Sequence, residues 1–242
     1  MKVKHMRPAL RRTDKASTTV LPLLCNGDRL TQPEFHRRYL TYPDDVHFEL
    51  IGGIVYVPSP QRMPHSDYDG ELGFIYGLYR RSTPGVGELH SPTTILGEES
   101  EPEPDLGLRI LEEYGGHSYV DDKGYLNGSA ELLSEIAHST VAIDMHLKKT
   151  DYEAAGVGEY LVICVAEQQL HWFDFANRGL ILPDAKGIYR SRIFPGLWID
   201  GPALLARQSD RLVRVAKQGL ASPEHAAFVK RLQAARRKHK SK

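Results

Sequence analysis

The sequence predicts an α/β domain in which helices flank a central sheet. Strand, helix and strand patterns alternate through residues 130–166, which is typical of this fold class. The stretch "GEYLVICVA" (158–166) is apolar at nearly every position, as expected of an interior strand that is covered on both faces. A hydrophobic content of 41% over 242 residues is enough for one such core with extensions.

Composition argues against several other classes of protein. The chain has 31 basic and 31 acidic residues, so no overall field draws it to nucleic acid or to an acidic membrane. It has no apolar run as long as a membrane span or a secretory signal. Cys25 and Cys164 lie far apart and predict no disulfide framework, so we expect a cytoplasmic protein in a reducing compartment.

The first elements are an arm and a short helix. Residues 1–30 are basic near the start and lack clear periodicity, so we expect a flexible arm. The motif "TQPEF" then opens a helix that ends near Leu40, with Thr31 and Glu34 forming a capping box.

A hairpin and a longer helix come next. In "HFELIGGIVYVPSP" (47–60), two strand-like runs flank Gly52 and Gly53, a pair that suits a tight turn. Residues 65–82 predict a helix because their apolar side chains recur at near-helical spacing.

The middle of the chain predicts strands joined by a long loop. We expect strands at 86–89, at 93–96, in "PDLGLRI" (104–110) and in "AELLSEIA" (130–137). The segment 111–129 is rich in Gly and Asp and is expected to be a loop.

The last third continues the α/β pattern. A helix should begin at Ser139 or Thr140 and stop at Gly156, and "QLHWFDFA" (169–176) should pair with the strand at 158–166. One or two short strands (187–200), a short helix (201–208) and a terminal helix with Pro223 at its first position should follow. We therefore expect an arm, a domain and a basic helical tail, at residues 1–30, 31–205 and 206–242.

Two carboxylates stand in otherwise apolar strand patterns. Asp105 follows a proline just before one strand run, and Glu135 lies inside "LLSEIA". If the two strands are neighbours, both side chains could emerge on one face a few ångströms apart, where they would repel each other. Mg²⁺ resolves that conflict, because it binds one or two carboxylates, keeps several waters and leaves room for a phosphate oxygen.

A lysine is expected beside them. Asp144, Lys148 and Tyr152 are spaced by four and share one helix face. A lysine there would stabilise the negative charge that develops when a phosphodiester is cleaved. Each feature alone has a structural explanation: an Asp after Pro is commonly a turn residue, and Asp144 with Lys148 is an ordinary surface pair worth about 0.3–0.5 kcal/mol. The combination and its order favour a site.

At these residues the sequence resembles a known family. The ordered set "FELIGGIVY", His65, "EPDLGL", "LLSEIAHST" and "DMHLKKTDYEAAGVGEYLV" resembles the Uma-type restriction endonucleases, a family of the PD-(D/E)XK nuclease superfamily. The likeness covers roughly residues 31–200. It implies a restriction-endonuclease-like fold: a mixed central sheet flanked by helices, with an N-terminal β-hairpin and a C-terminal helix.

The resemblance also implies roles. Asp105 and Glu135 would be the metal ligands, helped by a backbone carbonyl next to Glu135, for Mg²⁺ with Mn²⁺ as a substitute. Lys148 would be the catalytic lysine, Glu49 would touch the metal or a water, and His65 would position a water or a phosphate.

Some positions depart from the pattern or stay open. The superfamily lysine stands two residues after the acid, where this chain has Ala137, and Lys149 is the alternative to Lys148 on the following helix. His65 is equally suited to capping a helix or to the surface. His138 replaces a small residue of the family, and no zinc-ligand spacing is present.

The sequence thus predicts a metal-dependent endonuclease acting on DNA. Analogy with enzymes that cut both strands suggests a homodimer. Its basic tail would hold phosphates in a salt-dependent way, or is simply a solvated helix. Two rival hypotheses are a catalytically silent nucleic-acid-binding or interaction module, and a structural protein whose carboxylates serve caps and ion pairs. The nuclease hypothesis requires both carboxylates and the lysine amine to converge on one pocket.

Overall fold

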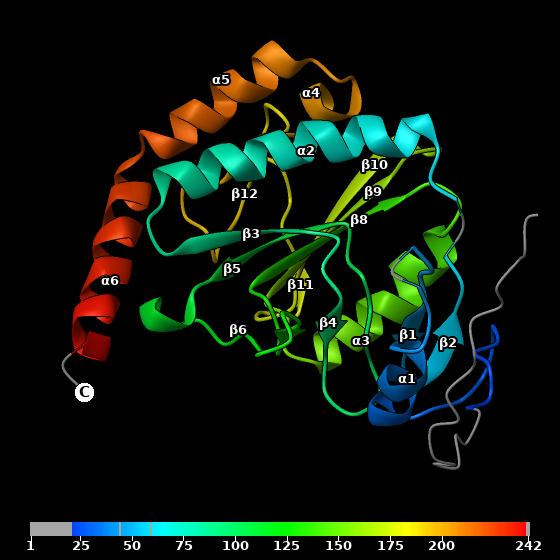
Figure 1. Cartoon of the computed structure of the whole chain (residues 1–242). Coiled ribbons are helices and arrows are strands. Elements are labelled where there is room, and N and C mark those ends of the chain that lie inside the picture. Colours follow the sequence, from blue (N-terminus) through cyan, green and yellow to red (C-terminus); the bar gives the residue numbers. More distant parts are fainter. Residues whose placement is uncertain (1–20, 44, 59, 241–242) are drawn as a thin grey trace, which may run out of the picture.

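A mixed six-stranded sheet forms the centre of the computed structural model, which describes residues 21–43, 45–58 and 60–240 (Figure 1). The strands, in spatial order, are β11 (Gly179–Leu180), β10 (Gln169–Asp174), β9 (Glu159–Cys164), β8 (Leu132–Ala137), β5 (Leu106–Ile110) and β3 (Val86–His90). β8 and β9 pair in parallel, and the other four pairs of this sheet are antiparallel. The mixed sheet flanked by helices that the sequence predicts is confirmed.

The two middle strands carry the most apolar sequence. Every residue of β8 and of β9 is buried, as expected of interior strands covered on both faces. Because successive side chains of a strand point to opposite faces, Leu132 and Ile136 join one core cluster, while Leu133 and Ala137 join another. Glu135 therefore points to the same face as Leu133 and Ala137.

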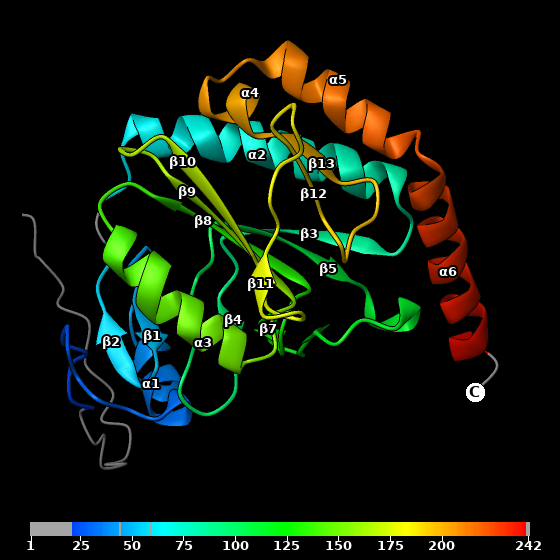
Figure 2. The ribbon, with the colours of Figure 1, turned by 180° about the vertical axis from the view of Figure 1, so that it is seen from behind.

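Helices cover each of those faces. α2 (Met63–Ser82) lies along one face, and η2 (Ile143–Lys148), a π-helix, runs into α3 (Lys149–Ala154) on the other (Figures 1 and 2). On the α2 side, α4 (Gly201–Leu205) and α5 (Ser209–Leu220) pack against α2. The predicted helix after β8 is thus present, but its middle has the wider π turn.

The N-terminal hairpin is confirmed. β1 (Glu49–Ile51) and β2 (Ile54–Tyr56) pair antiparallel, and the turn between them places Gly52 and Gly53 at φ of 55° and 75°, values that glycine adopts without strain. The hairpin shares a small core with α1 (Gln32–Tyr39), and the buried members are Leu24, Phe35, Phe48, Leu50 and Val55.

The segment just before α1 differs from the predicted flexible arm. Residues 21–30 pack along the hairpin: the backbone N–H groups of Gly27 and Leu30 donate to the carbonyls of Val55 and Gly53, at 2.8 and 2.9 Å. Leu24 is buried in the same small core. The hairpin thus ties down this part of the chain, and the rest of the predicted arm, residues 1–20, lies outside the described residues.

Several local details also differ from prediction. Thr31 precedes α1 but makes no side-chain cap, and Glu34 pairs with Arg37 and Arg38. The capping box is therefore wrong. α5 was not predicted as a separate helix.

The segment 111–129 is not wholly loop. It holds a 3₁₀ turn, η1 (Glu112–Tyr114), and two short strands, β6 (Tyr119–Val120) and β7 (Leu126–Asn127), which form a small sheet with β4 (Thr94–Ile95). A second small sheet pairs β12 (Ile188–Arg190) with β13 (Trp198–Asp200).

The basic tail belongs to the core. α6 (Pro223–Lys240) begins at Pro223 as predicted and contributes Phe228 and Leu232 to the cluster on the α2 face. It packs on η1, at the end of β5 remote from Asp105 (Figure 1). In the described part of the chain, no helix combines the length and the apolar character that crossing a membrane requires.

Candidate active site

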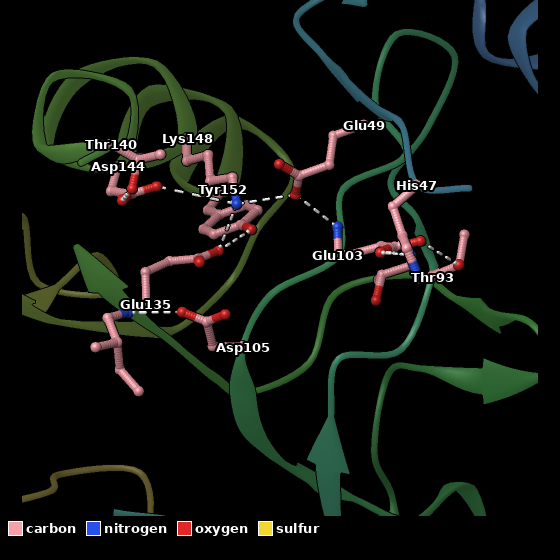
Figure 3. Close-up of polar contacts among 12 residues, drawn as sticks. His47, Glu49, Thr93, Glu103, Asp105, Glu135, Thr140, Asp144, Lys148 and Tyr152 are labelled. Carbon is pink, nitrogen blue, oxygen red and sulfur yellow. Dashed lines mark hydrogen bonds and ion pairs between the residues drawn. The ribbon is translucent and has the colours of Figure 1, made fainter. Parts of the chain in front are cut away.

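The pairing of β5 with β8 brings the two predicted carboxylates together. The antiparallel register pairs Leu106 with Ser134, so the next step along it sets Asp105 beside Glu135. Asp105 lies just before β5 rather than inside it, and its Oδ2 accepts a hydrogen bond of 2.7 Å from the backbone N–H of Ile136. Figure 3 shows the carboxylates of Asp105 and Glu135 turned toward each other.

His65 fixes the same oxygen of Asp105. It stands in the first turn of α2, and its Nε2 lies 3.1 Å from Asp105 Oδ2. Its Nδ1 is buried and has no partner among the described residues. Burial lowers the pKa of His65, but the hydrogen bond and charge of Asp105 reverse this and leave the pKa raised. A protonated ring here would donate to Asp105 and orient it.

Lys148 stands at the centre of the other contacts. Its amine lies 2.9 Å from Glu49 Oε1, 3.0 Å from Glu135 Oε1 and 3.9 Å from Asp144 Oδ1 (Figure 3). Burial lowers its pKa, but the three carboxylates more than compensate, and the pKa of Lys148 is raised well above its ordinary value. The amine therefore carries its charge at neutral pH.

Glu49 links the hairpin to the sheet. Its Oε1 also accepts a hydrogen bond of 2.8 Å from the backbone N–H of Glu103, two residues before Asp105. One carboxylate oxygen thus holds both the lysine and the segment that leads to Asp105. The predicted contact of Glu49 with a metal or water stays a prediction, whereas its contact with Lys148 is a feature of the fold.

The helical segment after β8 supplies two further polar groups. The Tyr152 hydroxyl donates to Glu135 Oε1 at 2.8 Å, and Thr140 Oγ1 donates to Asp144 Oδ2 at 2.5 Å. The π turn of η2 is wider than an α turn and, as at many functional sites, ends at a residue of the site, Lys148. The four-residue spacing of Asp144, Lys148 and Tyr152 was the sequence signal for the tyrosine.

Burial and mutual repulsion raise the pKa values of the acids. Burial raises the pKa of Glu135 well above its ordinary value; Lys148 opposes the shift and the Asp105 charge adds to it. Burial likewise raises the pKa of Asp144 to about 6, against the opposing effects of Lys148 and Thr140. These carboxylates are therefore costly to keep ionised without a further positive charge.

The charges in the site do not balance. The carboxylates of Glu49, Glu135 and Asp144 share one lysine, and Asp105 contacts His65, which adds at most one more positive charge. The side chains of Glu135, Asp144 and Lys148 are almost inaccessible, whereas those of Asp105, His65 and Glu49 are 13%, 11% and 10% exposed. The cluster is therefore more accessible at these three residues than at its lysine.

The two carboxylates and the lysine amine lie close together, but two hollows of the molecule lie elsewhere. One hollow of about 780 Å³ lies between α2 and α5, and one of about 480 Å³ lies between α1 and the segment 121–127. Neither is lined by Asp105, Glu135 or Lys148. Within the described ranges, no group of three or more His, Cys, Asp or Glu side chains is arranged to hold a metal ion.

Lys149 and His138 stand apart from the cluster. The Lys149 amine lies over the ring of Phe173, 4.9 Å from its centre, whereas the Lys148 amine lies among the carboxylates. His138 directly follows β8 and is half-buried.

Comparison with known proteins agrees with this fold. The sequence model of a nuclease family, Uma2, described as "Putative restriction endonuclease", matches residues 33–202. The chain belongs to this family. No curated protein matches it.

A solved structure supports the fold. The crystal structure of "a putative nuclease belonging to DUF820" from Anabaena variabilis ATCC 29413 superposes with a TM-score of 0.56 at 14% sequence identity. The match covers 70% of this chain and 96% of that one. The likeness to this structure is one of fold, and it agrees with the family match.

Proposed function

We propose that the chain is a divalent-metal-dependent endonuclease that hydrolyses phosphodiester bonds in DNA. The observation that carries this proposal is the excess of buried carboxylates around Lys148, in a family and fold of nucleases. Keeping several carboxylates ionised in a buried site is unfavourable unless a cation shares it.

The donor set fits Mg²⁺. Asp105 Oδ1 and Glu135 Oε2 receive no hydrogen bond from any described residue, while the other oxygen of each carboxylate is held by the protein. Two carboxylate oxygens with waters are a usual ligand set for Mg²⁺, and Mn²⁺ accepts the same oxygen donors. Such a set needs no third side chain. A bound cation of this kind would polarise a phosphoryl oxygen and lower the pKa of a bound water.

The chain's own residues would do the remaining work. Lys148, held by Glu49, places a positive charge beside Glu135, where it would stabilise the negative charge that develops on the phosphate. His65 and the Ile136 backbone would keep Asp105 in one orientation. The more exposed side of the cluster, at Asp105 and His65, is the side from which a phosphate would approach.

DNA as the substrate is supported by the family description and not by base-reading residues. The basic helix α6 lies at the far end of β5, so phosphate contacts there would be remote from the scissile bond. A homodimer would supply two sites for cutting both strands, and light scattering of the purified protein tests this part of the proposal.

The test is cleavage of supercoiled and linear DNA with Mg²⁺, with Mn²⁺ and with a chelator. Wild-type protein should cut only with metal, and Asp105→Asn should not cut although it stays folded. Asp210→Asn, which changes an exposed acid of α5, is the matched control and should cut like wild type.

Metal titration by calorimetry decides the case in which nothing is cut. Binding of Mn²⁺ by wild type but not by Asp105→Asn would support the metal site and indicate that the substrate is another nucleic acid. Absence of both cleavage and metal binding would overturn the proposal in favour of a silent binding module.

A further inference from the structure

Glu135 is held asymmetrically, and a tyrosine contributes to that asymmetry. Its Oε1 accepts hydrogen bonds from both Lys148 Nζ, at 3.0 Å, and the Tyr152 hydroxyl, at 2.8 Å. Its Oε2 has no donor among the described residues and belongs to the face turned toward Asp105 (Figure 3). The carboxylate is therefore anchored by one oxygen and open at the other.

The lysine does not fix this orientation by itself. Its amine is shared among three carboxylates, so it would follow whichever of them moves. The Tyr152 hydroxyl, in contrast, has Glu135 Oε1 as its one hydrogen-bond partner in the described chain. Its ring is fully buried and meets the Tyr160 ring edge-on at a centroid distance of 5.1 Å. Because the Tyr152 ring is buried and its hydroxyl has this one acceptor, the hydrogen bond fixes the orientation of the Glu135 carboxylate.

We propose that Tyr152 is a positioning residue of the site: its hydroxyl holds Glu135 Oε1 and so keeps Oε2 directed toward Asp105. The inference rests on the proposed metal-dependent function. Partners that orient a metal ligand through a hydrogen bond typically change metal affinity or activity by about 10–100-fold when they are removed.

Tyr160 provides the matched control. It is also fully buried, it lies in the same aromatic contact, and its hydroxyl donates to the Asp144 backbone carbonyl at 3.1 Å rather than to a ligand. Tyr152→Phe and Tyr160→Phe thus remove the same atom from neighbouring sites in the same core. Only the first removes a donor to Glu135.

The experiment measures Mn²⁺ affinity by calorimetry for wild type, Tyr152→Phe, Tyr160→Phe and Asp105→Asn, with thermal unfolding of each without metal. Tyr152→Phe should bind Mn²⁺ about 10-fold more weakly than wild type. Its cleavage rate should largely recover at saturating metal, because the ligand is misdirected but present. Tyr160→Phe should bind Mn²⁺ as wild type does, with a comparable loss of thermal stability.

Two results would overturn the positioning role while leaving the proposed function intact: wild-type Mn²⁺ affinity in Tyr152→Phe, or an equal loss of affinity in both tyrosine variants, which would mean a general loosening of the core. A wild-type protein that binds no Mn²⁺ would instead overturn the proposed function, and the positioning role with it. A metal-free crystal structure of Tyr152→Phe gives a second readout, in which the Glu135 carboxylate should turn from its present direction.

Discussion

Two glutamates on neighbouring strands of the central sheet are both buried, yet the protein treats them differently. Glu159 begins β9 and is satisfied on both oxygens: Oε2 accepts from Trp172 and Ser191, and Oε1 accepts from the backbone N–H groups of Arg192 and Ile193. Glu135, on β8, has two donors on one oxygen and none from the described residues on the other.

The difference separates a structural acid from a candidate ligand. Glu159 ties the segment 191–193 to the sheet, and its hydrogen bonds offset part of the cost of burying the charge, although burial still leaves its pKa raised. Glu135 keeps an open oxygen beside a second carboxylate, which is unfavourable for the free protein and useful only if a cation arrives. The informative feature is therefore an open carboxylate oxygen beside a second carboxylate, not burial alone.

The largest contrast should come from neutralising each glutamate in turn. Glu135→Gln should lower the DNA cleavage rate by more than about 100-fold, because it removes a direct ligand rather than a supporting group. Glu159→Gln should cut DNA at wild-type rate but unfold more easily by about 1–3 kcal/mol, because an amide NH₂ cannot accept from the donors around it. Cleavage assays and urea unfolding of both variants measure this. An equal loss of cleavage in both variants would show that Glu159 is not merely structural.

The two adjacent lysines should differ nearly as much. Lys148→Met should reduce cleavage by about 10²–10³-fold, the usual effect of losing one group that stabilises developing charge. Lys149→Met should leave cleavage unchanged and lose only the contact with Phe173, worth about 0.5–1 kcal/mol. Single-turnover cleavage at saturating metal is the measurement. A defect that followed Lys149 instead would mean that the helix register at the site is different in solution.

Much of the fold could be predicted because its signals are local. Continuous apolar sequence indicates the interior strands. The glycine pair Gly52–Gly53 indicates the hairpin turn, because the turn needs positive φ at both positions. The two-residue strands β4, β6 and β7 are too short to show any period, and they depend on distant contacts. The helix α5 does have a helical pattern, with Leu212, Val215, Ala216 and Gly219 buried, but it was not separated from the rest of the predicted helical tail.

The site shows the same limit. Asp105, Glu135 and Lys148 were found from their order and spacing, and the fold brings them together. The sequence alone does not separate Glu135 from Glu159, since each is a lone glutamate in an apolar run. The deciding fact is the set of donors around each, and those come from segments as distant as 191–193. The π turn was also beyond prediction, because an apolar pattern with α spacing does not mark it.

The pH dependence of stability tests the pKa of Asp144, one of the carboxylates around Lys148. Burial raises the pKa of Asp144 from an ordinary value of 3.8 to about 6, so the folded protein binds its proton more tightly than the unfolded chain does. The stability from this group is thus fully present below about pH 4 and is lost as pH rises through 6. At about 1.4 kcal/mol per pKa unit, wild type should lose about 3 kcal/mol relative to Asp144→Asn across that interval.

Metal-free unfolding of both proteins in urea between pH 4 and 7 measures this difference. A constant difference across the interval would show that Asp144 is ionised as easily in the folded protein as in the unfolded chain. Burial would then cost Asp144 less than its surroundings indicate.

The smallest expected effect lies on the structural side. Ser191 Oγ donates to Glu159 Oε2 at 2.7 Å and accepts from the backbone N–H of Phe194 at 2.8 Å, so Ser191→Ala removes two hydrogen bonds and should cost about 1–2 kcal/mol of stability. Ligand binding to the folded state raises stability by mass action, so added Mn²⁺ should raise the unfolding temperature of Ser191→Ala and of wild type equally. The same metal should not stabilise Glu135→Gln. If Ser191→Ala lost its response to Mn²⁺, the two glutamates would belong to one coupled unit, and the division between a structural acid and a metal ligand would be wrong.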